Sequence, residues 1–207
     1  MAELIDISPL ISPRIAVWPG DVGFSRRYAL QIAEGANIDL SAIESTVHLG
    51  AHTDAPSHYV HPGAGIAERP LSLYYGPCQV IAVTAPRGER IHPEHIPEPI
   101  ATERVLMFTG SYPDPDVFNE DFNSLSPELI HWLAEQGVRL VGIDTPSIDP
   151  FHSKALESHH AVAERDMGVL EGVVLGHVAP GRYTLIALPL RIEGADASPV
   201  RAVLLPG

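Results

Sequence analysis

The segment HLGAHTDAPSHY, residues 48–59, concentrates side chains that bind metals or move protons. It holds three histidines and one aspartate, all at even-numbered positions: His48, His52, Asp54 and His58. A regular strand would send them to one face, but His48 and His52 would then lie about 13 Å apart. Two imidazole nitrogens must each come within ~2.0–2.1 Å of a shared zinc ion. The chain must therefore bend if both histidines bind one metal.

Gly50 is the residue that can allow this bend, because glycine adopts backbone conformations that other residues avoid. Helical spacing would also bring His48 and His52 together, but Gly50 and Pro56 disfavour a long helix. A single histidine in a strand is usually a packed or capping residue. Four ligand-type side chains around a glycine favour a metal site instead. Nitrogen and carboxylate donors without thiolates suit zinc, manganese or iron(II).

A second source of ligands is ESHHAVAERDMGVLEG, residues 157–172. His159 and His160 lie in an expected helix, and Glu171 stands alone among apolar residues. An isolated carboxylate in an apolar run is costly to bury unless it is paired or binds a metal. A histidine pair on a helix surface and a glutamate at a turn are the alternative interpretation of these residues.

The first segment resembles the H-x-G-[TA]-H-x-D-x-P-x-H signature of the cyclase-like metal-dependent hydrolases. RIAVWPGD (14–21) and YTLIALPLRIEGADASPVRAVLLP (183–206) are similar to the bacterial kynurenine formamidases (arylformamidases) within that family. The similarity spans nearly the whole chain. Ala51 departs from the pattern, since threonine is commoner there, but this position is not a ligand.

The resemblance implies a fold, an activity and a partner. The fold would be a swivelling β/β/α-type domain that forms a homodimer. Two Zn²⁺ ions per chain would support hydrolysis of N-formyl-L-kynurenine to L-kynurenine and formate, a step of tryptophan degradation. Mn²⁺, Fe²⁺ or Cd²⁺ could fill the same ligands.

By position, the resemblance places the metal ligands of the family on five residues of this chain: His48, His52, Asp54, His159 and Glu171. The first three would hold one zinc ion, and Asp54 and the glutamate would bridge to the second. The family spacing of twelve residues before that glutamate selects His159 over His160. His58 matches the catalytic acid/base. Trp18 matches an aromatic residue that contacts substrate, and a half-buried core aromatic is the alternative for it.

The pattern of apolar residues predicts a strand-rich α/β fold. Seven short apolar or β-branched runs bounded by glycine or proline predict strands at 4–8, 14–18, 79–85, 104–110, 139–144, 183–192 and 200–205. Ser126 as N-cap and Pro127 at the first position predict a helix that ends at Gly137. A second helix is expected over roughly 153–167. We therefore expect one domain over residues 1–207 with a mixed sheet or partial barrel.

Composition excludes several classes of function. The 207 residues carry a net charge of −13 and no basic tract, which argues against binding nucleic acid or an anionic membrane surface. We expect a small-molecule substrate. Cys78 is the only cysteine, so no internal disulfide can form, and a cytoplasmic location is expected. No signal peptide is recognisable, and no apolar run reaches the ~18–20 residues that cross a membrane.

Two other functions remain open at this point. Relatives in the resembled family also open cyclic amides such as isatin, and a non-catalytic zinc-binding protein would need the same ligands. His58 argues against the second alternative, because it follows the metal-binding bend without being needed as a ligand. The sequence holds no G-x-S-x-G elbow for a serine nucleophile. Asp144 and Asp149 end a strand and could border the site, but we do not expect them to bind metal.

Overall fold

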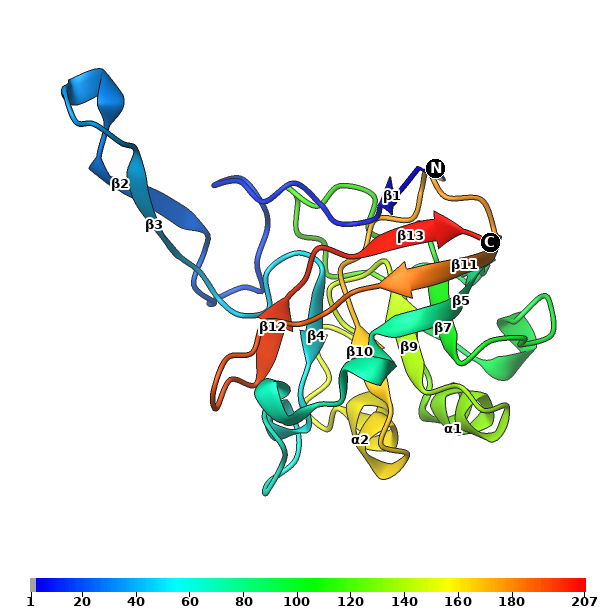
Figure 1. The fold of residues 1–207 in the computed structure, drawn as a ribbon. Coiled ribbons are helices and arrows are strands. Elements are labelled where there is room, and N and C mark those ends of the chain that lie inside the picture. Colours follow the sequence, from blue (N-terminus) through cyan, green and yellow to red (C-terminus); the bar gives the residue numbers. More distant parts are fainter. Residues whose placement is uncertain (1–2) are drawn as a thin grey trace.

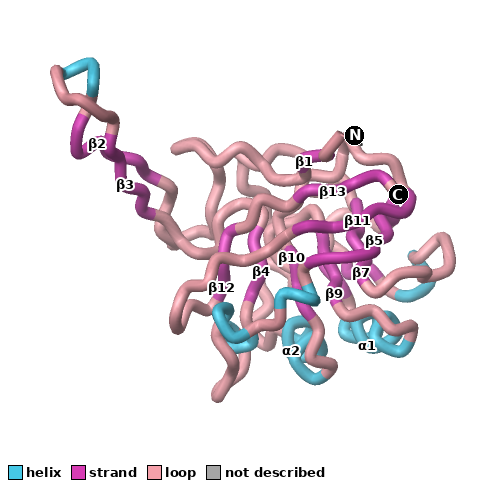
Figure 2. Tube along the Cα trace, in the orientation of Figure 1, coloured by secondary structure: helices cyan, strands magenta, loops and turns pink. Residues whose placement is uncertain are grey.

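A curled, mixed seven-stranded sheet forms the centre of the protein in a computed structural model that describes residues 3–207 (Figures 1 and 2). Its strands, in spatial order, are β1 (Ile5–Asp6), β13 (Val203–Pro206), β11 (Gly181–Ile186), β5 (Tyr75–Ala82), β7 (Arg104–Phe108), β9 (Leu140–Ile143) and β10 (Gly168–Leu170). From β1 to β5 the neighbours are antiparallel, and from β5 to β10 they are parallel. The predicted strand-rich α/β fold is confirmed.

Helices α1 (Pro127–Glu135) and α2 (Glu157–Glu164) lie together on one side of this sheet (Figure 1). Helix α1 begins as predicted, because the Ser126 hydroxyl accepts a hydrogen bond from the Leu129 amide at 3.1 Å. Leu129, Ile130 and Leu133 form its fully buried face. The local cap and the apolar face together explain why this helix could be predicted accurately.

Both faces of the sheet are buried, which explains the nearly continuous apolar runs in its strands. In β7, Val105 and Met107 belong to the core beneath the two helices. Leu106, between them, belongs to a second core that also holds Leu185 and Leu204 of the antiparallel strands. The alternation follows from the two-residue period of a strand.

Three two-stranded sheets complete the fold. β4 (His52–Asp54) pairs antiparallel with β12 (Ala197–Pro199), and β6 (Arg90–Ile91) pairs parallel with β8 (Ser124–Leu125). β2 (Ser25–Leu30) and β3 (Leu40–Glu44) form a hairpin that stands away from the rest of the molecule (Figure 1). We call residues 25–44 the arm, and all residues of its two strands are exposed. No helix among residues 3–207 has the length and apolar character needed to cross a membrane.

The prediction of a strand at 14–18 is wrong. These residues form a turn and an extended loop, flanked by Pro13 and Pro19, which have no amide hydrogen to give to a ladder. Ile15 is nevertheless buried, and the Ala16 amide donates to the Pro115 carbonyl at 2.9 Å. The apolar residues of this segment line a pocket instead of extending a sheet.

Most of the predicted strands and the second helix are shorter than expected, and the hairpin of the arm is not among the predicted elements. The strand expected over 183–192 ends at Ile186, shortly before Pro189. The helix expected over 153–167 begins only at Glu157, because Leu156 has a left-handed backbone with φ of 47°.

Candidate active site

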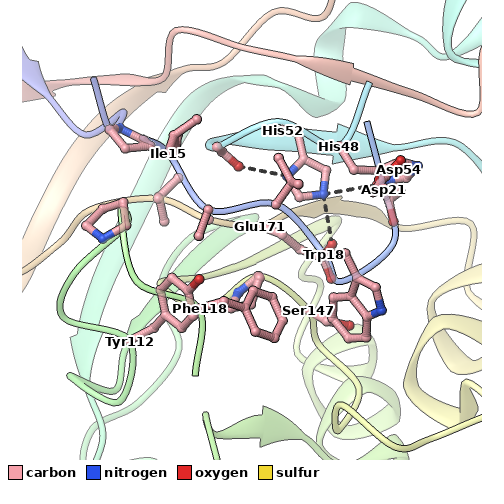
Figure 3. Close-up of a pocket in the computed structure, with 18 of the residues that line it drawn as sticks. Ile15, Trp18, Asp21, His48, His52, Asp54, Tyr112, Phe118, Ser147 and Glu171 are labelled. Carbon is pink, nitrogen blue, oxygen red and sulfur yellow. Dashed lines mark hydrogen bonds and ion pairs between the residues drawn. The ribbon is translucent and has the colours of Figure 1, made fainter. Parts of the chain in front are cut away.

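The carboxyl ends of parallel strands β9 and β10 meet at one pocket of about 490 Å³. Figure 3 shows the side chains of residues that line this pocket. Asp144 directly follows β9 and Glu171 directly follows β10, and both line the pocket. Open α/β sheets bind ligands at this end of their parallel strands, because the connecting loops gather there. The pocket is therefore the candidate active site.

The predicted bend in the motif is present at Gly50, whose φ is +57°. It brings the rings of His48 and His52 to a centroid separation of 5.2 Å. Gly172, with φ of +66°, lies against the same turn, and a Cβ on it would overlap the Gly50 carbonyl oxygen. Two glycines thus let the motif and the end of β10 approach closely.

His52 and Glu171 are held side by side by their backbones. The amide of each donates to the carbonyl of the other, at 3.0 and 2.9 Å. Their side chains meet, with His52 Nε2 3.3 Å from Glu171 Oε2 and 3.5 Å from Asp54 Oδ1 (Figure 3). His52 Nδ1 lies 2.8 Å from the Gly50 carbonyl, which can only accept. This contact places the hydrogen on Nδ1 and leaves Nε2 free to bind a metal.

His159 reaches the same carboxylates from α2. Its Nε2 lies 3.5 Å from Asp54 Oδ2 and 3.4 Å from Glu171 Oε1. Its Nδ1 lies 2.8 Å from Asp149, whose carboxylate also accepts the backbone amides of Ser158 and His159 at 3.1 Å. Asp149 therefore caps the start of α2 and orients the imidazole at once. His160 is exposed on the same helix.

Both oxygens of the Asp54 carboxylate and both oxygens of the Glu171 carboxylate face histidine nitrogens, an arrangement that fits bound metal. Asp54 Oδ1 is 2.9 Å from His48 Nδ1, while its Oδ2 faces His159. Despite these short distances, Asp54 Oδ1 and His159 Nε2 are buried and have no hydrogen-bond partner within residues 3–207. Such atoms are costly unless another group satisfies them. The sets His48–Asp54–His58 and His52–Asp54–Glu171 each bring their ligand atoms within 4.8 Å of one another.

The charges of this cluster depend on one another. Burial alone would raise the pKa of Asp54, but the imidazoles of His159 and His48 that face its carboxylate hold this pKa well below its usual range. Burial alone would lower the pKa of His48, but the Asp54 carboxylate, 2.9 Å from its Nδ1, raises this pKa to about 9. Protons on the histidines offset the buried carboxylates. Divalent cations can do the same, and their binding would release those protons.

Aromatic side chains form another wall of the pocket. The ring of Trp18 lies 5.0 Å from that of Phe151 and 5.6 Å, edge-on, from that of Phe118. Tyr112 also lines the pocket and packs against Phe118 at 6.0 Å. Such a wall suits a flat, aromatic ligand.

The structure brings every predicted site residue to this one pocket: Trp18, His48, His52, Asp54, His58, His159 and Glu171. Sequence reasoning missed the aromatic neighbours of Trp18 and one further carboxylate, Asp196. Asp149, which the sequence placed only at the border of the site, contacts His159 Nδ1 at 2.8 Å. Asp196 lies 3.0 Å from His48 and 3.2 Å from His58. No motif marks Asp196, which lies 138 positions after His58 in the sequence.

Comparison with known proteins identifies the family. The Cyclase family model matches residues 5–150, which is more than half of the chain. The chain belongs to the cyclase family. A kynurenine formamidase of Bordetella avium is 46% identical over 99% of this chain and 98% of its own length. That of Maricaulis maris is 42% identical with the same coverage.

Solved structures share the fold. A protein described as a potential metal-dependent hydrolase with cyclase activity is 28% identical, with a TM-score of 0.84 over 99% of this chain and 98% of its own. A protein of Bacillus stearothermophilus described as a predicted metal-dependent hydrolase is 27% identical, with a TM-score of 0.83 and the same coverage. Isatin hydrolase A of Ralstonia solanacearum is only 19% identical and shows the likeness of fold alone, with a TM-score of 0.83 over 99% of this chain and 92% of its own. This cyclase family member is a hydrolase with clusters that can hold metal.

Proposed function

We propose that this hydrolase converts N-formyl-L-kynurenine to L-kynurenine and formate. The observation that best supports this proposal is the pocket, in which a histidine–carboxylate cluster lies beside an aromatic wall. The cluster suits hydrolysis of an amide, and the wall suits an aryl ring. Relatives more than 40% identical over nearly their full length are named kynurenine formamidases, which supports this substrate over other amides.

The proposal includes two metal ions per chain, with zinc as the expected ion. His48, His52 and Asp54 would hold the first, while Asp54 and Glu171 would bridge to a second. His159 would complete the second set, and its buried Nε2 without a hydrogen-bond partner supports that role. Metal ions bound there would lower the pKa of water and polarise the formyl oxygen.

His58 and Trp18 would handle the substrate. The oxygen of water bonds to the formyl carbon, the carbon–nitrogen bond breaks, and the aniline nitrogen must take a proton as formate leaves. His58 lines the pocket with its side chain 35% exposed, so it can accept the proton of the attacking water and deliver it to that nitrogen. Trp18 lines the same pocket and would contact the aryl ring.

Formate release from N-formylkynurenine tests the activity. The purified protein should release formate, lose the activity when a chelator strips its metal, and regain it with added zinc. Activity that persists after metal analysis shows no metal would contradict the metal-dependent mechanism. Faster opening of isatin than release of formate would favour the cyclic-amide alternative.

The variant His58→Ala tests the proton transfer. It should keep both metals and lose roughly 10²–10⁴-fold in rate on N-formylkynurenine, the usual contribution of a general acid/base. The loss should be smaller on an activated aryl ester, because a phenolate leaves without a proton. Equal losses on both substrates would contradict the role as leaving-group acid, and loss of metal would make His58 a ligand instead.

A homodimer is also part of the proposal, and the arm supports it. A two-stranded hairpin alone is marginally stable in water, yet this one exposes large apolar side chains: Tyr28, Leu30, Ile32, Ile38, Leu40 and Ile43. We expect a second copy of the chain to cover these apolar side chains. β2 carries Arg26 and Arg27, and these two positive charges would be attracted to a second copy, whose net charge is −13.

A reducing, cytoplasmic setting fits the single cysteine, which is buried. That residues 1–207 act as one domain stays a prediction.

A further inference from the structure

Asp196 reaches the site through the pairing of two short strands. β12 runs antiparallel to β4, with Ala197 opposite Asp54. Just before this pair, the Ala55 amide donates to the Asp196 carbonyl at 2.8 Å. The backbone of Asp196 is therefore anchored to the motif strand itself. Its carboxylate is placed beside the motif although the residue lies 138 positions after His58.

One carboxylate oxygen of Asp196 contacts two histidines. Its Oδ2 lies 3.0 Å from His48 Nε2 and 3.2 Å from His58 Nδ1. The other nitrogen of His48, Nδ1, faces Asp54 at 2.9 Å, so this ring spans the two aspartates. A carboxylate oxygen has two lone pairs and can accept both hydrogen bonds. Within residues 3–207, His58 Nε2 has no hydrogen-bond partner, and the side chain lines the pocket.

We propose that Asp196 is a positioning residue for His58, a role that rests on the proposed function. By accepting a hydrogen bond from His58 Nδ1–H, it leaves the lone pair on Nε2 for the water that attacks the substrate. It also stabilises the imidazolium that forms when His58 has taken that proton. The same oxygen fixes the ring of His48, so the proton-transfer residue and a candidate metal ligand keep a constant separation, with ring centroids 4.2 Å apart.

A double-mutant cycle on the zinc-loaded protein tests this role. Asp196→Ala should lower kcat on N-formylkynurenine by about 10–100-fold, the usual cost of losing such an outer partner, with KM changed less than about twofold and both metals retained. In a His58→Ala background the same change should cost almost nothing, because the residue through which Asp196 acts is gone. Asp196→Asn should recover part of the rate, since an amide oxygen can still accept one hydrogen bond. Glu193→Ala is the matched control, because Glu193 is exposed in the same loop and makes no side-chain hydrogen bond to residues 3–207.

Two outcomes would overturn the proposal. Equal losses from Asp196→Ala with and without His58 would show that Asp196 acts elsewhere. Loss of a metal from Asp196→Ala would show that Asp196 supports the metal site through His48 and does not act through His58.

A spectroscopic measurement tests the positioning role of Asp196 independently of which substrate the protein hydrolyses. Nitrogen-15 NMR of the zinc-loaded protein should show His58 with its hydrogen on Nδ1, and Asp196→Ala should remove that preference. A wild-type His58 with its hydrogen on Nε2 would overturn the positioning role even if the protein releases formate. Failure to release formate together with the Nδ1–H form would instead contradict the proposed substrate alone.

Discussion

At the scale of single residues, the adjacent histidines of α2 have opposite environments. His159 is buried against Asp54 and Glu171, whereas His160 is exposed, since consecutive helical residues point about 100° apart. We expect His159→Ala to bind one metal per chain and His160→Ala to bind two. Metal analysis of each variant after refolding with excess zinc checks this. Loss of a metal only from His160→Ala would contradict the assignment.

Asp149 should control the affinity of the proposed second metal site, because it contacts His159. Burial alone would raise its pKa, but the hydrogen bond with His159 lowers it to about 2, so it accepts from this ring as a carboxylate. Asp149→Asn should weaken binding of the second zinc by about 10–100-fold. Titration against a chromophoric chelator measures the effect. Asp144→Asn is the control, because Asp144 accepts from Thr109 and Gly110 and touches no histidine. Equal weakening in both variants would contradict the role of Asp149.

At the scale of elements, the close approach of the motif to the end of β10 depends on Gly172. A left-handed backbone alone costs a non-glycine residue about 1–2 kcal/mol. In Gly172→Ala, overlap with the Gly50 backbone should add to this, so the free energy of unfolding should fall by more than about 2 kcal/mol. Gly35→Ala is the control, because Gly35 has φ of +93° with nothing near its missing Cβ. Urea unfolding of the two variants checks the difference, and equal losses would show that the approach is not tight.

At the scale of the whole molecule, the arm should decide the oligomeric state. Ile43 lies in β3 opposite Arg26 of β2, and it is 69% exposed. A charge there should prevent an apolar contact with a second copy. We expect the wild type to be a dimer and Ile43→Glu a monomer in light scattering coupled to gel filtration. Leu71→Glu, on a residue 57% exposed outside the arm, should remain a dimer. A monomeric wild type would contradict the proposed homodimer.

The features that the sequence by itself determined depend on residues that are close together in the chain. The Ser126 cap and the apolar face of α1 lie within three turns of chain, so propensity and periodicity predicted that helix. The motif likewise contains both its ligand-type side chains and the glycine that bends them together. In each case the interacting residues are neighbours in the sequence. The residues that cause the helix to begin and the motif to bend are therefore visible in the sequence pattern itself.

The tertiary structure alone decided the surroundings of the site. Trp18 and Phe118 meet across a hundred positions of sequence, and Asp196 meets His58 across 138. Ile15 is apolar as a strand residue would be, yet it is buried by packing against the turn at Gly50. The arm exposes apolar residues that the sequence pattern did not mark as a hairpin. These outcomes depend on contacts between segments that are far apart in the sequence. When a residue is buried against a distant segment, the local sequence shows no periodic pattern of apolar residues that would predict it.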